Sequence, residues 1–304
     1  MQKRHGRRLL AVLAVVGCLV AAGQPEALAA YPGRNGNIAF EFGEKLRSAH
    51  VFTMDSSGEH RRAVDRPGAR WEPTWSPDGR MIAYYKPGYH LFQQSWDGFL
   101  RIMRPNGDRV GTVAAFAPIG GDMSWSPNAR RIVLTSFLSC QDNDGWYRIA
   151  IVRVRDGECL FATRGATVKY DPAWSPNGRR IAFIKGERGN IFTMRPDGRR
   201  TDRVTDTATF KRSPDWAPDG SRIVFISDGD VAVVGARGGP ITMLTDTARE
   251  ESDVVFSPNG RRIAFDRCCY GPNDVSKIFK MRLDGSAERV LGRGSNPDWQ
   301  PLPR

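Results

Sequence analysis

One short motif recurs along the chain, and this recurrence restricts the fold more than any other feature. The clearest copy is Asp171-Pro-Ala-Trp-Ser-Pro-Asn-Gly-Arg-Arg-Ile-Ala-Phe183, in which Pro-Asn-Gly joins two short apolar segments. The aromatic anchors of five copies lie 50, 49, 42 and 40 residues apart, and they are Trp75, Trp125, Trp174, Trp216 and Phe256. A fixed signature with a period of about 40–50 residues is typical of repeat proteins, in which neighbouring units bury each other's apolar faces.

Each repeat predicts a four-stranded sheet with strands A to D. In the copy around Trp174 the predicted strands are Pro172–Ser175, Arg180–Ile184, Asn190–Met194 and Asp202–Thr205. Tight turns join A to B and C to D, because the glycine of an Asn-Gly or Asp-Gly pair adopts the positive φ that such hairpins need.

The two ends of the chain complete one further unit. Asn37-Ile-Ala-Phe40 reads as a strand B without its own strand A, and Asn296-Pro-Asp-Trp299 reads as a strand A without a following strand B. Pairing them closes a ring and removes the open sheet edges that a row of blades would expose. The sequence therefore predicts an all-β, six-bladed β-propeller, closed by the C-terminal strand A pairing with the N-terminal strands B, C and D.

These units resemble the WD-like Pro-Asp propeller repeats of the TolB family, which carry Trp-Ser-Pro-Asp-Gly-x-x-Ile-Ala-Phe. The copy Trp75-Ser-Pro-Asp-Gly-Arg-Met-Ile-Ala-Tyr84 follows that pattern closely, and the resemblance covers residues 31 to 301. The resemblance implies the propeller fold. We expect no α/β domain of the kind that precedes the TolB propeller, so the resemblance does not carry over the whole Tol–Pal role.

Residues 1–29 are predicted to be a secretory signal peptide, followed by the propeller over residues 30–304. Lys3, Arg4, Arg7 and Arg8 precede the apolar run Leu9–Ala22, and Ala27-Leu-Ala29 supplies small residues for cleavage. The apolar run is shorter than the roughly 20 residues that a membrane-spanning helix needs. No later stretch is longer, so we expect a mature chain that is secreted or extracytoplasmic and has no transmembrane segment.

A second interpretation of the N-terminus stays open. Val15-Val-Gly-Cys18 fits a lipoprotein cleavage box, which would leave the chain anchored through a lipidated Cys18. Against it, the apolar run continues past the cysteine through Leu19-Val-Ala-Ala22.

The chain is basic, with a formal net charge of +12. Loss of residues 1–29 would remove Lys3, Arg4, Arg7, Arg8 and Glu26 and leave a charge of +9. An exported basic surface suits anionic partners, such as an anionic polysaccharide, and export argues against nucleic acid. The alternative is that the arginines only solvate hairpin turns, as at Arg179-Arg180 and Arg261-Arg262.

The predicted strand directions divide the connections between two faces. The tight A–B and C–D turns make a uniform face, called here the plain face. The B–C and D–A connections make the variable face, where blade 2 is predicted to carry the long loop Lys86–Gly98 and blade 3 the loop Leu138–Trp146. Aromatic residues in and near these loops are candidate binding residues, because aromatic faces suit sugar rings or apolar anchors of a partner: Trp71, Tyr89, Phe92, Trp96 and Trp146. Packing of the loops against the blades is the other interpretation.

A second candidate set stands three residues before each anchor. It should surround the channel mouth on the variable face and comprises Glu72, Asp122, Asp171, Ser213, Asp253 and Asn296. The four acids, Glu72, Asp122, Asp171 and Asp253, could hold a hard cation such as calcium through oxygen ligands. The favoured interpretation is that each side chain caps the backbone of its own D–A loop, with no cofactor, and calcium titration separates the two.

No catalytic signature is present. The chain lacks Gly-x-Ser-x-Gly, His-Glu-x-x-His and a phosphate-binding glycine loop, and the pairing of Cys140, Cys159, Cys268 and Cys269 stays open. We therefore favour an exported, non-catalytic binding module that recognises an envelope or extracellular protein through the variable face and channel mouth. The alternative is a polysaccharide-binding or carbohydrate-active propeller, acting as a lyase or hydrolase.

Overall fold

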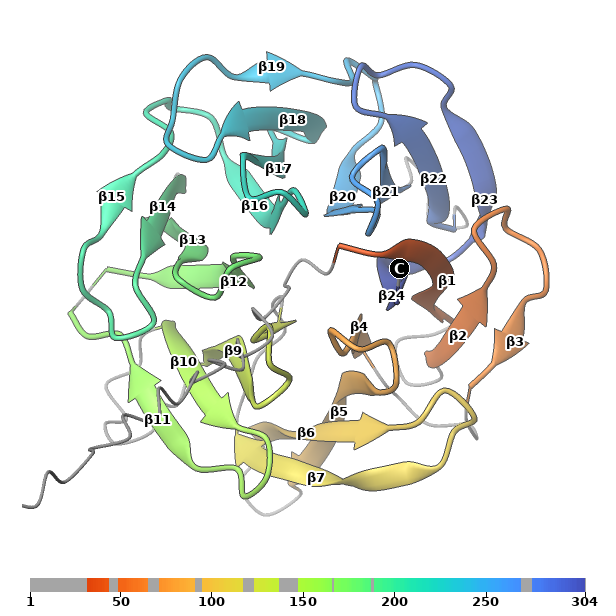
Figure 1. Ribbon diagram of the computed structural model, residues 1–304, viewed down its shortest axis with the longest axis vertical. Helices are drawn as coiled ribbons and strands as arrows, with labels where there is room; N and C mark the ends of the chain where they lie inside the picture. The colour runs from red at the N-terminus through yellow and green to blue at the C-terminus, as the bar shows by residue number, and fades with distance from the viewer. Residues whose placement is uncertain are drawn as a thin grey trace, which may run out of the picture.

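The chain forms a ring of six four-stranded antiparallel sheets around a central channel (Figure 1). The computed structural model describes residues 32–43, 49–64, 71–90, 95–116, 123–136, 147–165, 167–186, 189–268 and 275–303, with side chains at all of these except 87–90, 95–97, 114–116 and 161–162. The described residues contain strands and turns and no helix that could span a membrane. The predicted fold class is confirmed. The predicted signal peptide lies outside the described residues.

Each blade runs outward from an innermost strand A. Blade 1 contains β24 (Ser295–Leu302), β1 (Arg34–Phe42), β2 (His50–Met54) and β3 (Arg62–Ala63). Blade 2 contains β4 (Trp71–Trp75), β5 (Ile82–His90), β6 (Ser95–Met103) and β7 (Arg109–Phe116). Blade 3 contains β8 (Met123–Trp125), β9 (Arg131–Ser136), β10 (Arg148–Arg153) and β11 (Cys159–Ala162).

The other three blades follow the same order. Blade 4 contains β12 (Lys169–Trp174), β13 (Ile181–Lys185), β14 (Asn190–Met194) and β15 (Asp202–Arg203). Blade 5 contains β16 (Lys211–Trp216), β17 (Arg222–Ser227), β18 (Asp230–Gly235) and β19 (Thr242–Met243). Blade 6 contains β20 (Glu251–Phe256), β21 (Arg262–Arg267), β22 (Lys277–Arg282) and β23 (Arg289–Arg293).

The ring closes as the sequence predicts, through the last strand. β24 pairs antiparallel with β1, with Trp299 opposite Ile38 and Asp298 opposite Ala39. Both Trp299 and Ile38 are buried. Figure 1 shows β24, drawn in blue, beside the red β1, so the two ends of the described chain share one sheet.

The apolar core lies between blades rather than within one. A buried cluster joins each pair of neighbouring blades, and the one between blades 4 and 5 contains Ala173, Ile184, Trp216 and Phe225. Some anchor tryptophans also hydrogen-bond across the interface, as where Trp216 Nε1 donates to the Ala173 carbonyl at 3.2 Å. Each blade therefore depends on its neighbours for burial.

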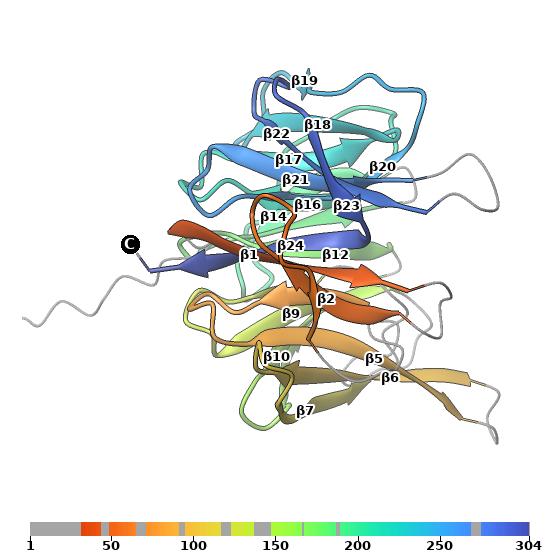
Figure 2. The ribbon, with the colours of Figure 1, turned by 90° about the vertical axis from the view of Figure 1, so that its right-hand side faces the viewer.

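The predicted loop Lys86–Gly98 is largely a β-hairpin. β5 and β6 continue as paired strands with Tyr89 opposite Trp96 and His90 opposite Ser95. Pro87 and Gly88 suggest a break, but the flanking aromatic residues are strong strand formers and the ladder runs through them. In Figure 2 this hairpin extends from blade 2 on the variable face, at the lower right.

Candidate functional site

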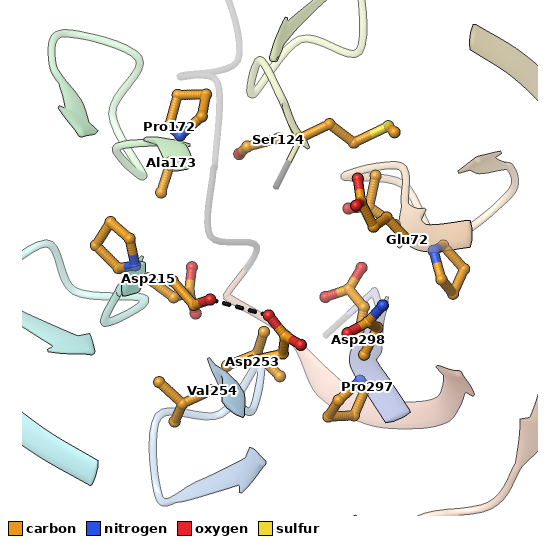
Figure 3. Close-up of a pocket in the computed structure, with 16 residues that line it drawn as sticks. Glu72, Ser124, Pro172, Ala173, Asp215, Asp253, Val254, Pro297 and Asp298 are labelled. Atoms are coloured by element: carbon orange, nitrogen blue, oxygen red, sulfur yellow. Dashed lines mark hydrogen bonds between the residues drawn. The ribbon is translucent and has the colours of Figure 1, made fainter. Parts of the chain in front are cut away.

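The centre of the ring holds a small cavity of about 100 Å³ that all six inner strands line (Figure 3). It contains polar side chains on β4, β8, β16, β20 and β24 and prolines on several of these strands. Drug-sized ligands occupy pockets of about 300–1,000 Å³, so this cavity has room for water or one inserted side chain and not for a sugar chain.

The candidate residues before the anchors share an unusual backbone conformation. Glu72, Asp171, Ser213, Asp253 and Asn296 all have positive φ, between 39° and 56°. Each lies where the register between strand A and strand B shifts by a bulge. Asp and Asn tolerate the left-handed region better than most residues, so backbone geometry explains much of this recurring residue type. The sixth position, Asp122, lies outside the described residues.

These residues form hydrogen bonds with one another and with Glu41 around the channel. Asp171 Oδ2 accepts from the Ser213 amide at 3.1 Å, and Ser213 Oγ donates to Asp253 Oδ1 at 2.9 Å (dashed in Figure 3). Asn296 Nδ2 donates to Glu41 Oε1 at 2.6 Å, and the Glu72 amide donates to the same oxygen. The bonds from Asp171 to Ser213, from Ser213 to Asp253 and from Glu41 to Glu72 connect successive blades, whereas Asn296 and Glu41 both belong to blade 1. Capping of each residue's own loop stays a prediction.

A second ring of polar side chains, which the sequence interpretation missed, lies directly before the anchors. Asp298 Oδ2 accepts from the Trp75 amide at 2.6 Å, and Asp215 Oδ2 accepts from the Phe256 amide at 2.7 Å. Ser124 Oγ accepts from the Trp174 amide at 3.0 Å. The available signal was a polar residue just before four of the six anchors: Thr74, Ser124, Asp215 and Asp298.

Burial weakens the acidity of the carboxyl groups around the channel. Burial raises the pKa of Asp215 to about 7 and that of Asp298 to about 6, and the two carboxyl groups repel each other. Burial likewise raises the pKa of Glu41 to about 7 and the pKa values of Asp253 and Asp266. Near neutral pH the channel wall therefore holds protonated acids as well as carboxylates.

Among the described residues, no three His, Cys, Asp or Glu side chains are arranged to share a metal ion. The described residues include three of the four candidate acids, Glu72, Asp171 and Asp253, and they do not include Asp122. The described residues therefore provide no cluster of ligands that supports the calcium hypothesis.

The structure brings part of the aromatic set to one place. Trp71 precedes Glu72 in β4, and its ring lies 5.8 Å from that of Tyr85 in β5. The backbone pairs Tyr89 with Trp96 farther along the same hairpin. Phe92 and Trp146 lie outside the described residues. Trp71 therefore adjoins the channel mouth, and the hairpin extends from the same blade on the variable face.

The described histidines and cysteines lie at separate places in the fold. His50 lies in β2 with a buried Nδ1 that has no partner, whereas His60 is exposed in the C–D turn of blade 1 and contacts Asp55. Cys159 and Cys268 are each disulfide-bonded, in blades 3 and 6. The described histidines are thus outside the channel.

The chain is similar to known TolB proteins. Residues 97–302 match a family model described as TolB beta propeller domain. A curated relative, Tol-Pal system protein TolB 1 of Novosphingobium aromaticivorans, is 40% identical over 75 residues, which make up 24% of this chain and 16% of that protein. The match therefore spans about a sixth of the relative's length.

Two solved structures have the same fold. TolB from Acinetobacter baumannii gives a TM-score of 0.71 at 21% identity, covering 88% of this chain and 67% of that one. A putative TolB from Agrobacterium tumefaciens gives a TM-score of 0.63 at 19% identity, covering 87% of this chain and 92% of that one. At these identities the likeness concerns the fold alone.

Proposed function

Because the chain belongs to the TolB beta propeller domain family, we propose that it is an exported, non-catalytic module that binds an envelope or extracellular protein. The binding surface consists of the channel mouth and the β5–β6 hairpin on the variable face. Export is supported by the charged and apolar pattern of residues 1–29 and agrees with disulfide-bonded Cys159 and Cys268.

One observation carries this proposal: the β5–β6 hairpin departs from the repeat. β5 and β6 have 9 residues each, whereas the equivalent strands of blades 4, 5 and 6 have 5 or 6. A rigid ring that presents one extended element is a common arrangement for recognition. The Tyr89–Trp96 pair in that element supplies the aromatic residue types that are enriched in binding hot spots.

The size of the channel argues for protein recognition at the mouth. Its polar side chains bond to neighbouring blades, and the cavity of about 100 Å³ is too small for a polysaccharide. A protein partner needs only to cover the mouth and contact the hairpin. The relative whose name places it in the Tol-Pal system supports a partner in the cell envelope.

The test is affinity capture from envelope extract with purified chain, followed by affinity measurement with the captured protein. Trp96→Ala should weaken binding at least tenfold, because truncating a hot-spot aromatic residue costs about 2 kcal/mol or more. Phe210→Ala is the matched control, an exposed aromatic residue on the same face near blade 5. Equal affinities for Trp96→Ala and the unchanged chain would exclude the hairpin, and saturable binding on a glycan array would favour the polysaccharide alternative.

A further inference from the structure

A groove on the plain face is lined by arginine side chains that have no role in the proposed function. It lies between blades 3 and 4 and has a volume of about 680 Å³. Its walls carry Arg131 at the start of β9, Arg179 in the A–B turn of blade 4 and Arg195 in the C–D turn of blade 4. Its floor is formed by Ile151 and Leu160, which belong to the apolar cluster between the two blades.

The three guanidinium groups are free to meet an anion. Arg131, Arg179 and Arg195 are exposed and form no ion pair with any residue that the structure describes. Their neighbours differ: Arg180 pairs with Asp202 at 2.6 Å, and Arg153 pairs with Asp156 at 3.1 Å.

One acid also lines the groove. It is Asp197, whose Oδ1 accepts from the Arg199 amide at 2.9 Å. Three arginines against one aspartate leave the groove positively charged.

The turns beside the groove are basic. The A–B and C–D turns of blade 4 carry Arg179, Arg180, Arg195, Arg199 and Arg200 against Asp197, and Arg180 pairs with Asp202 of β15. Blades 2 to 6 end at this face in short A–B and C–D turns, and blade 1 ends there in a C–D turn and in the paired ends of β1 and β24 (Figure 2). A face with distributed positive charge suits a broad anionic surface.

The described chain also begins at this face. The Gly33 amide donates to the Pro258 carbonyl at 3.1 Å, beside the A–B turn of blade 6. In the lipoprotein alternative, an anchor at Cys18 would therefore be joined to the propeller on the plain face.

We propose that the plain face docks on an anionic lipid surface and that the groove between blades 3 and 4 receives one phosphate headgroup. Guanidinium groups bind phosphate oxygens in bidentate geometry, and three of them surround the opening. The apolar floor suits the carbon atoms next to the phosphate. A volume of about 680 Å³ accommodates a headgroup of this kind.

The experiment measures co-sedimentation of the exported chain with vesicles of phosphatidylglycerol and, separately, of phosphatidylcholine. Binding to phosphatidylglycerol should be saturable and weaken with added salt, because the attraction is electrostatic. The triple variant Arg131→Gln, Arg179→Gln, Arg195→Gln should bind at least tenfold more weakly. The control variant Arg164→Gln, Arg249→Gln, Arg293→Gln loses the same charge on the variable face and should bind within twofold of the unchanged chain.

Three results would overturn the proposal. Equal losses in the two triple variants would mean attraction by net charge alone. Equal binding to phosphatidylcholine would mean apolar attachment, and binding of inorganic phosphate without vesicle binding would mean a small-anion site. Melting curves of both variants should match that of the unchanged chain, since all six side chains are exposed. Because the groove and the hairpin occupy opposite faces, failure here leaves the protein-binding proposal intact.

Discussion

At the scale of single residues, Asp215 shows how an inter-blade bond and a buried charge conflict. Its carboxyl group is the acceptor for the Phe256 amide in the next blade, yet burial raises its pKa to about 7 from the usual 3.8. The folded state thus binds a proton that the unfolded chain releases above about pH 4. Stability is therefore fully present at acidic pH and is lost as the pH rises toward about 7.

We expect a free energy of unfolding that falls between about pH 4 and pH 7, and Asp215→Asn should flatten this dependence by about 4 kcal/mol, at roughly 1.4 kcal/mol for each pKa unit. Asparagine keeps an oxygen acceptor for the Phe256 amide and carries no charge. Urea unfolding at the two pH values measures the effect. A steeper or unchanged slope in Asp215→Asn would contradict the prediction.

At the scale of elements, the A–B hairpin owes its shape to a buried serine as well as to its glycine. In blade 4, Ser175 Oγ accepts from the Arg180 amide at 2.8 Å and donates to Asn177 Oδ1 at 3.1 Å. Gly178 completes the turn with φ of 67°. The same serine bonds occur in blades 2, 3 and 6, whereas blade 5 has Ala217 in place of the serine.

This difference gives a matched pair of substitutions. Ser175→Ala should lower stability by about 1 kcal/mol, since the partly buried Arg180 amide loses its acceptor. Ala217→Ser should raise stability by up to about 1 kcal/mol, because it introduces the missing acceptor at a buried position of the same turn. Thermal unfolding of both variants checks the pair. A stabilising Ser175→Ala would show that the serine bonds do not hold the turn.

At the scale of the whole molecule, stability depends on closing the ring. β24 places Trp299, 2% exposed, in the cluster between blades 6 and 1, and its Asp298 accepts from the Trp75 amide of blade 2. Removing this strand exposes β1 and opens two interfaces at once.

Deletion of residues 294–304 should therefore abolish the cooperative unfolding transition, as followed by circular dichroism. Trp299→Ala, which keeps the strand, should cost about 3–5 kcal/mol and preserve a cooperative transition. A truncated chain that melts like the intact one would refute closure through β24.

The sequence by itself determined the propeller and its closure. The evidence was the spacing of the repeats, the Asn-Gly and Asp-Gly turns and the two complementary chain ends, and period and turn chemistry are local properties of the chain. The motif around Trp174 also located the ring of Asp171 and its equivalents. Only the tertiary structure decided what those side chains contact: Asp171 bonds to Ser213, which is 42 residues away. It likewise decided that Asp298 bonds to the Trp75 amide and that Arg131 and Arg195 share a groove, because such contacts form between blades whose residues lie far apart in the sequence.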